Sequence, residues 1–330
     1  MCKISIIIPI LNEEKYIKNC IDSIINSNID NFELILVDGG SRDNTVKIIK
    51  TFQNESASIK LLHNPKKFTP ISMNLGIEAS QGDYIFIISA HAEYQDNYFI
   101  HLADEVKRLN ANCVGGVLNT EVQNSNKKSN SIKKILTHKF GVGNADFRTG
   151  GSQVKEVDTV AFGCYTKETF KKFGFYNEKL IRNQDIELNK RIVNGGGKIY
   201  LIPDITATYY ARENFTDLAQ NNFSNGKWNI LTAYYTKTFK SLSLRHFIPL
   251  IFLLTLLLPI LFSLFNIKFL WLALLSLVSY LSLVIISSLK SKDKDSSFFY
   301  LVVSFLTLHL SYGLGSLVGL FSTIIKYIKR

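Results

Sequence analysis

The stretch Lys3-Ile4-Ser5-Ile6-Ile7-Ile8-Pro9, followed by Phe32-Glu33-Leu34-Ile35-Leu36-Val37, decides the fold class of this chain. Both runs are rich in aliphatic, largely β-branched side chains, which is typical of strands buried on both faces of a parallel sheet. Between them lies a helical pattern with Asn12 as a suitable N-cap and an apolar face made of Ile17, Cys20, Ile21 and Ile24. This alternation predicts an α/β fold with a doubly wound, mostly parallel sheet.

The alternation continues along the chain. Further strands are expected at residues 59–62, 84–88 and 113–118, and Thr69-Pro70 is expected to open a helix, since the missing proline amide costs nothing there. A second alternation begins near Val157 and ends in an edge strand, Lys198 to Ile202, which Pro203 is expected to close. Asn214 is expected to cap the helix that follows.

Polar side chains follow two of the predicted strands. Asp38 leads into Gly39-Gly40-Ser41, and Ser89-Ala90-His91 follows the fourth strand. Ligands of open α/β sheets bind at the carboxyl ends of the strands. Because both turns follow the carboxyl ends of predicted strands, they are the first indication of a ligand-binding site.

A carboxylate opens the later helix within Arg182-Asn183-Gln184-Asp185-Ile186-Glu187-Leu188-Asn189. Asn183 is a good N-cap, Gly195-Gly196-Gly197 stops the helix, and the helix dipole favours the charged form of Asp185 in the first turn. An ionised aspartate is the form that a general base needs. Taken alone, this stretch is better explained by Asp185 and Glu187 being ordinary acidic residues at a helix N-terminus.

Composition limits the partners and the compartment. The 330 residues carry a formal charge of +11, which points to anionic lipid headgroups and phosphorylated substrates; no nucleic-acid motif accompanies the charge. The four cysteines are widely spaced, so a reducing cytosol is expected for the globular part. Pro9 and the polar residues after it argue against a secretion signal at the N-terminus.

Three apolar runs, 247–265, 269–288 and 298–325, are each long enough to span a bilayer of about 30 Å hydrocarbon thickness. Asn266-Ile267-Lys268 joins the first two in a tight hairpin. A third full span would put Lys326 outside, against the positive-inside rule, so its topology stays open. The glycines 313, 315 and 319 indicate either a break or a close helix contact.

Two connecting segments allow alternatives. The polar, glycine-containing residues 119–150 are expected to form a mobile loop over the cleft or a membrane-facing segment. Residues 228–245 mix aromatic and basic side chains, which suits the headgroup interface as well as it suits an amphipathic helix packed on the domain.

Several ordered motifs resemble those of family 2 glycosyltransferases of the GT-A fold. They are Ser5–Pro9 with Asn12-Glu13, then Val37–Thr45, Phe162-Gly163, Arg182–Asp185 with Glu187 and Asn189, and Gly226-Lys227-Trp228. The match is closer to membrane-associated exopolysaccharide enzymes of the succinoglycan type and covers about residues 3–325.

The resemblance implies roles for single residues. Pro9, Glu13 and Asp38 would bind the nucleotide of a nucleotide-sugar, with Asp83 as a weaker candidate. Asp185 would be the general base of an inverting transfer. Glu187, Gln220, Lys227 and Trp228 would lie on the acceptor side, although the spacing from Gln220 to Lys227-Trp228 and the lysine itself depart from the Gln-x-x-Arg-Trp element of processive relatives.

The expected metal site also departs from the family. Family members usually carry Asp-x-Asp after the fourth strand to hold a divalent cation, and the exopolysaccharide subgroup often carries Asp-Ala-His; here Ser89-Ala90-His91 lacks the first carboxylate. His91 is expected to ligate Mn²⁺ or Mg²⁺, with Ser89 as a weak or water-mediated contact to the donor site.

These expectations combine into one function. A single sugar would move from a nucleotide-sugar, expected to be a UDP-sugar, to a polyprenyl-diphosphate-linked acceptor in surface or exopolysaccharide assembly, at the cytosolic face of the plasma membrane. The alternatives are a polyprenyl-phosphate glycosyltransferase and, because position 89 is not Asp, a catalytically inactive membrane scaffold. A small transporter would leave the nucleotide-type half unexplained.

The expected organisation has four parts. Residues 1–118 form the nucleotide-sugar-binding half, 119–228 the acceptor half with the base, 229–246 a basic aromatic interfacial segment, and 247–330 the transmembrane region with two to three spans.

Overall fold

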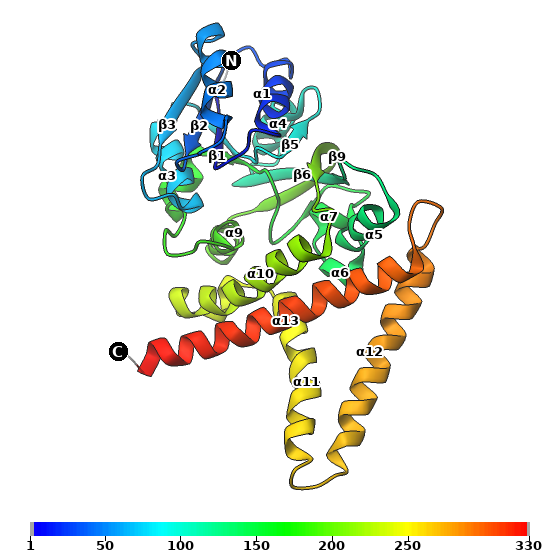
Figure 1. Cartoon of the computed structure of the whole chain (residues 1–330). Helices are drawn as coiled ribbons and strands as arrows, with labels where there is room; N and C mark the ends of the chain where they lie inside the picture. The colour runs from blue at the N-terminus through cyan, green and yellow to red at the C-terminus, as the bar shows by residue number, and fades with distance from the viewer. Residues whose placement is uncertain (1–2, 329–330) are drawn as a thin grey trace. The chain divides into compact units, whose positions relative to one another are not determined.

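The computed structural model describes residues 3–328, which form two compact units (Figure 1). The first unit contains the chain up to Asn119 together with Ala145–Tyr210, and the second contains Thr120–Asn144 and the chain from Ala211 onward. The expected functional boundaries at residues 118, 228 and 246 stay predictions, because compactness does not test them.

The first unit is built on a mixed sheet whose parallel part is the predicted one. Strands β1 (Ile4–Ile10), β2 (Phe32–Asp38), β3 (Ile59–His63) and β4 (Tyr84–Ile87) run parallel in the order β3-β2-β1-β4. The crossover helices are α1 (Ile17–Ile25), α2 (Thr45–Glu55) and α3 (Thr69–Ala79). The side chains of β1 are almost wholly buried, as the aliphatic run predicted.

Antiparallel strands extend the sheet beyond β4. They are β8 (Cys164–Thr166), β6 (Cys113–Glu121), β9 (Ile199–Tyr210), β5 (Ala92–Tyr94) and the short β7 (Lys155–Glu156). The expectation that Pro203 closes the edge strand was wrong, because β9 runs through it. Pro203 falls between the stretch that pairs with β7 and the stretch that pairs with β5, so its missing amide breaks neither ladder.

The helix ends correct two predicted caps. Tyr16, and not Asn12, precedes α1; Asn12 instead accepts a hydrogen bond from the amide of Arg42 through its side-chain oxygen at 2.8 Å. Asn183 does precede α9 (Gln184–Asn194), but it lies in the left-handed region at φ 62° and its side chain makes no capping bond. The other helices of this unit are α4 (Tyr98–Arg108), α7 (Asp146–Thr149) and α8 (Lys167–Phe173).

The second unit is helical and includes most of the segment that was expected to be a loop. That expectation for residues 119–150 was wrong, because α5 (Lys127–Leu136) and α6 (Lys139–Val142) form there. Asn126 caps α5 in a capping box, and Ile132 and Ile135 bury its apolar face. In the sequence, the lysines on the other face of α5 made its short apolar helical pattern difficult to recognise.

The rest of the second unit follows Asn214, which caps α10 (Phe215–Thr236) as predicted. Two short 3-10 turns, η1 (Phe239–Ser241) and η2 (Leu244–Phe247), lead to α11 (Ile248–Phe262) and α12 (Phe269–Ser291), which form the predicted hairpin. The long α13 (Phe298–Ile328) is continuous through its glycines and runs along α10 (Figure 1).

Glycines allow α10 and α13 to approach until their backbones touch. A Cβ placed on Gly315 would meet the carbonyl oxygen of Phe223 at 1.9 Å, and one on Gly226 would meet that of Tyr312 at 2.0 Å. Of the two explanations offered for this glycine cluster, the structure therefore confirms the close helix contact.

Replacing Gly315 with alanine is expected to destabilise the second unit, because α10 must move away to relieve the clash. A cost of about 1–3 kcal/mol is typical of such overpacking, which corresponds to a fall in Tm of about 2–4 °C per kcal/mol. Thermal unfolding of the purified protein in detergent measures it. Leu314→Ala, at the exposed neighbouring position, is the control. Equal Tm values for the two variants would contradict the close contact.

Candidate functional site

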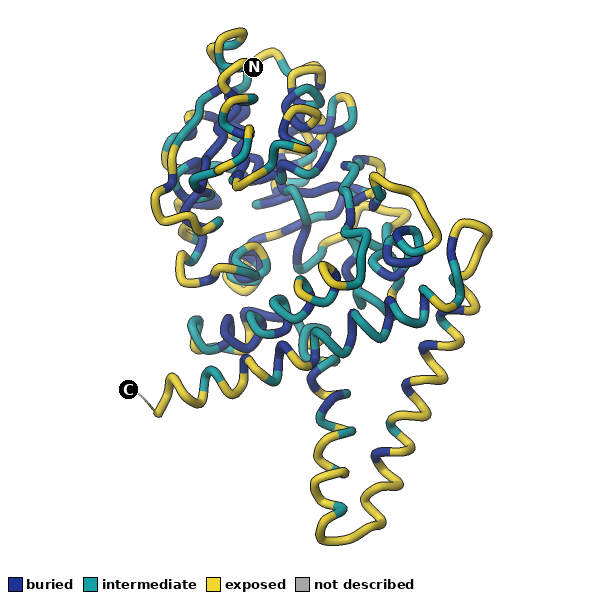
Figure 2. The backbone as a smooth tube through the Cα atoms, viewed as in Figure 1, coloured by how far each residue is buried: buried dark blue, intermediate teal, exposed yellow. Residues whose placement is uncertain are grey.

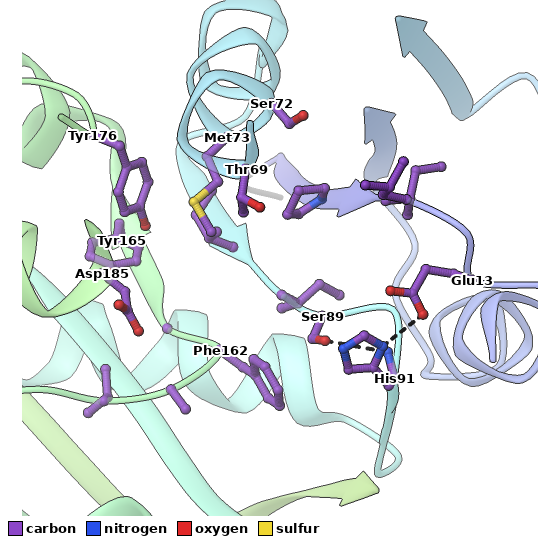
Figure 3. Close-up of a pocket in the computed structure, with 18 of the residues that line it drawn as sticks. Glu13, Thr69, Ser72, Met73, Ser89, His91, Phe162, Tyr165, Tyr176 and Asp185 are labelled. Carbon is purple, nitrogen blue, oxygen red and sulfur yellow. Dashed lines mark hydrogen bonds and ion pairs between the residues drawn. The ribbon is translucent and has the colours of Figure 1, made fainter. Parts of the chain in front are cut away.

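A cavity of about 300 Å³ lies in the first unit, at the carboxyl ends of β1 and β4 (Figure 3). Its wall contains Pro9 at the end of β1, Glu13 in the loop after it, Ser89 and His91 in the loop after β4, and Asp185 at the start of α9. The structure thus brings together five of the residues proposed from sequence, drawn from segments far apart in the chain.

Glu13 and His91 are hydrogen-bonded to each other within this wall. Oε2 of Glu13 lies 2.8 Å from Nδ1 of His91 (Figure 3). The rings of His91 and Tyr16 make a T-shaped contact with their centroids 5.6 Å apart. When the carboxylate accepts a hydrogen from Nδ1, a neutral imidazole keeps its lone pair on Nε2. This is the arrangement of a metal-ligating histidine oriented by a carboxylate. Sequence reasoning identified both residues but not their contact.

The same wall decides whether a divalent cation fits. Among residues 3–328, no group of three or more His, Cys, Asp and Glu side chains forms a metal-binding cluster. His91, supported by Glu13 and next to the Ser89 hydroxyl, offers few ligands. Mg²⁺ and Mn²⁺ at phosphate sites commonly take most of their ligands from the substrate and water. The residues therefore fit a cation held mainly by a diphosphate, and they do not fit a cation enclosed by protein.

Asp38 is held by its own turn. It is 6% exposed, accepts hydrogen bonds from the amides of Gly40 and Ser41, and accepts a third from the Ser41 hydroxyl at 2.6 Å. The strand register pairs Asp38 with Ile10, directly after Pro9, although Asp38 is outside the wall of the cavity.

Asp83 precedes β4 at the opposite end of the sheet, beside Lys3, so the structure does not bring it to the cavity.

Asp185 is an exposed residue by its accessible surface, and it lines the wall of the cavity. Burial raises the pKa of this carboxyl, while hydrogen bonds from the amides of the first turn and the positive charge of Arg148 oppose the rise. Tyr165 and Tyr176 lie beside it (Figure 3), and Tyr165 donates a hydrogen bond to Asn189 at 2.9 Å. A base kept in a partly desolvated wall titrates closer to neutral pH than a free aspartate.

Arg148 is the residue near Asp185 that sequence reasoning missed. Its guanidinium carbon lies 5.2 Å from the centre of the Tyr209 ring and 5.5 Å from that of Phe147. Nη1 is buried and, within the described residues, has no hydrogen-bond partner. The sequence did not single out Arg148 because α7, which carries it, lies in the segment 119–150 that was not expected to be helical.

Phe162 and Gly163 form the floor between β4 and α9. Phe162 adopts φ 51°, which is uncommon for an aromatic residue, and its carbonyl accepts a hydrogen bond from the Tyr98 hydroxyl at 3.1 Å. A Cβ on Gly163 would meet the sulfur of Cys113 at 2.7 Å. Both residues line the cavity, and Gly163 allows the chain to pack closely against Cys113.

The proposed acceptor residues are divided between the units. Glu187 is buried in the first unit and paired with Arg191 at 2.8 Å, so it supports α9. Gln220, Lys227 and Trp228 are on α10 in the second unit, where Trp228 stacks on Tyr235 at a centroid distance of 6.3 Å. Their roles toward an acceptor stay predictions.

Comparison with known proteins identifies the family to which this chain belongs. The sequence model described as glycosyl transferase family 2 matches residues 5–165. The chain is 30% identical over 236 residues to the dolichyl N-acetyl-alpha-D-glucosaminyl phosphate 3-beta-D-2,3-diacetamido-2,3-dideoxy-beta-D-glucuronosyltransferase of Methanococcus voltae, with 68% of this chain and 71% of that protein covered. It is 28% identical to the succinoglycan biosynthesis protein ExoA of Rhizobium meliloti (strain 1021), with 67% of each covered.

Solved structures show the same fold. S. aureus TarS superposes with a TM-score of 0.51 at 14% identity, covering 74% of this chain and 43% of that one. GalNAc-T7, solved with UDP, GalNAc and Mn²⁺, superposes with a TM-score of 0.51 at 14% identity, covering 64% and 44%. The chain spans less than half of either structure, and the likeness concerns the fold alone. Together with the extended match to the Methanococcus protein, the findings show that the chain belongs to glycosyl transferase family 2.

Proposed function

We propose that this protein is an inverting glycosyltransferase that moves one sugar from a nucleotide-sugar, preferably a UDP-sugar, to a polyprenyl-diphosphate-linked acceptor in surface or exopolysaccharide assembly. One observation carries the proposal: the cavity is lined on one side by Asp185 and on the other by Glu13, Ser89 and His91. A base and a diphosphate-binding wall in one cavity are what a single displacement needs.

The reaction balances in one step. The oxygen of the acceptor hydroxyl attacks the anomeric carbon and gives its proton to the Asp185 carboxylate. The bond from that carbon to the donor diphosphate breaks at the same time, and the diphosphate oxygen takes the electron pair. Attack from the face opposite the leaving group inverts the anomeric centre, so no covalent enzyme intermediate is required.

A divalent cation is part of the proposal, with His91 as its protein ligand and Ser89 beside it. When bound, Mn²⁺ or Mg²⁺ would neutralise the charge that develops on the leaving diphosphate. Glu13 orients His91, while Pro9 lines the nucleotide pocket and Asp38 shapes the loop next to it.

The acceptor is inferred from the membrane helices and the relatives. Three helices of the described chain are long and apolar enough to cross a membrane. The Methanococcus relative is named for a dolichyl-linked sugar phosphate. The helices favour a lipid-linked acceptor, and the name of the relative favours an acceptor that already carries a sugar over a bare polyprenyl phosphate. Acceptor assays with the two lipids separate these alternatives. We place the catalytic unit on the cytosolic side of the plasma membrane.

A second function, a catalytically inactive scaffold in a membrane complex, is favoured by a single observation, the missing carboxylate at Ser89. It predicts neither transfer nor donor hydrolysis with Mn²⁺ or Mg²⁺ present. The open cavity around Asp185 favours the enzyme.

Asp185→Asn is expected to lower the transfer rate by about 10²–10⁴-fold, because the amide cannot accept the proton. The affinity for the nucleotide-sugar, measured by calorimetry, should change little. Asp83→Asn, the same change at the far end of the sheet, is the matched control and should transfer normally. Wild-type rates in the Asp185 variant would remove this residue from the role.

Arg148→Gln is expected to move the acid limb of the profile of kcat/KM against pH to higher pH. The guanidinium favours the ionised form of Asp185, so its loss raises the pKa of a carboxyl that must be deprotonated to act. Arg148→Lys keeps the charge and should move the limb less. An unchanged limb, or one at lower pH, would show that Arg148 does not act on the base.

Metal affinity tests the role of His91. His91→Ala should raise the Mn²⁺ concentration needed for half-maximal UDP binding, and Glu13→Ala should raise it by about 10–100-fold, as expected for loss of an orienting carboxylate. Ser89→Asp, which restores the missing carboxylate, should lower it. If His91→Ala left the Mn²⁺ dependence of binding and turnover unchanged, the metal assignment would be wrong.

A further inference from the structure

The three long apolar helices of the second unit are not equivalent. Helices α11 and α12 are predominantly apolar, and only 11% and 17% of their most hydrophobic windows are buried by protein. The corresponding value for α13 is 44%. In Figure 2 most residues of the α11–α12 hairpin are exposed, whereas buried residues recur along most of α13.

Protein already covers one face of α13. Helix α10 lies against it through the glycine contacts, and the Ser316 hydroxyl donates to the carbonyl of Gly226 at 3.1 Å. On the side of α5 and α6, Leu301 and Phe305 are fully buried, and Nε2 of His309 lies 2.9 Å from the carbonyl oxygen of Phe140. These contacts extend over much of the helix and fix it to its neighbours.

The covering helices are too polar for the hydrocarbon of a bilayer. α5 carries four lysines, Lys127, Lys128, Lys133 and Lys134, and Lys134 pairs with Asp293 just before α13 at 2.8 Å. Lys133 pairs with Glu121. Each lysine or aspartate at the bilayer centre costs about 2.5–3.5 kcal/mol. If α13 crossed the membrane, it would carry this charged layer with it or lose the contacts that bury it.

The uncovered face of α13 is an apolar stripe. Five of its exposed residues repeat at spacings of four and three, which keeps them on one side of the helix: Leu314, Val318, Phe321, Ile325 and Ile328. Leu320 and Ile324 widen the exposed apolar surface. Near the end of the helix the Lys326 ammonium donates a hydrogen bond to the Tyr235 hydroxyl at 2.6 Å and lies 4.8 Å from the centre of that ring. An exposed apolar face with protein on the opposite face and a cation beside it is the pattern of a helix lying in the headgroup interface.

We propose that α13 does not cross the membrane but lies in its plane, on an anionic lipid surface, and that only the α11–α12 hairpin spans it. The hairpin is long enough: α12 has 23 residues, and η2 with α11 gives 19, about 34 and 28 Å at 1.5 Å per residue against a hydrocarbon core of about 30 Å.

This arrangement places basic residues on one side of the membrane. Arg245 before the hairpin, Lys290 and Lys292 after it and Lys326 at the end of α13 would all face the same leaflet, as the positive-inside rule favours. Anionic headgroups attract each such residue by about 1 kcal/mol. The inference rests on the second unit alone and does not depend on the catalytic proposal.

Single cysteines and a membrane-impermeant maleimide test the topology in the full chain. The described native cysteines, Cys20, Cys113 and Cys164, are buried, and Cys2→Ser removes the fourth, so this parent without an added cysteine measures background. We expect Lys294→Cys and Tyr327→Cys to be labelled from the same side, and Asn266→Cys, at the hairpin tip, from the opposite side. Labelling of Tyr327→Cys together with Asn266→Cys would overturn the proposal. Labelling of all three from one side would overturn the spanning hairpin.

Depth measurements provide an independent test that does not rely on labelling efficiency. Nitroxides attached at Leu314→Cys and Ile325→Cys, in vesicles of phosphatidylglycerol and phosphatidylethanolamine, should report the same depth near the headgroups. A spanning helix would separate these positions by about 16 Å along the membrane normal. A depth difference of that size would overturn the proposal.

Discussion

The partly desolvated carboxylate of Asp185 is the constraint on which the account of the first unit depends. An aspartate among tyrosines and aliphatic side chains is penalised in its charged form, which is the reason that burial raises its pKa. The start of α9 and the charge of Arg148 limit the penalty. The same balance that destabilises the ionised form strengthens it as a base, and Phe162 and Gly163 line the same cavity.

In the opposite wall of the cavity, Glu13 and His91 hold each other in position. Glu13 would be an ordinary acidic loop residue without His91, and His91 would be an ordinary loop histidine without Glu13. Their contact at 2.8 Å fixes one ring nitrogen and leaves the other for a ligand. If His91 binds a cation as we propose, this contact would compensate for the first carboxylate that the metal motif lacks.

The parallel half of the sheet and the helix ends at Pro70, Asn214 and Gly195 were predictable, because each follows from a short-range rule of burial, capping or missing amides. The course of β9 past Pro203 was not, since it depends on which neighbours pair on either side of that residue. Arg148 was beyond reach for the same reason: its effect on Asp185 exists only once α7 and α9 are folded. Of the residues that line the candidate site, the sequence singled out Pro9, Glu13, Ser89, His91 and Asp185, but it did not show the contact between Glu13 and His91.

For the membrane helices, too, the sequence predicted one part and only the folded contacts revealed the other. Length and hydropathy identify three candidate spans and leave the topology of the third open, whereas the glycine contacts and the lysines of α5 distinguish α13 from the hairpin.

The central claim, direct displacement in this cavity onto a lipid-linked alcohol, is tested most directly by the product. Membranes containing the protein are incubated with a panel of radiolabelled nucleotide-sugars, and the lipid extract is analysed for the anomeric configuration of the new linkage. The account predicts a labelled lipid-linked sugar, formed from at least one donor, with configuration opposite to that of the donor. Retained configuration, or label in no lipid product from any donor of the panel, would contradict it.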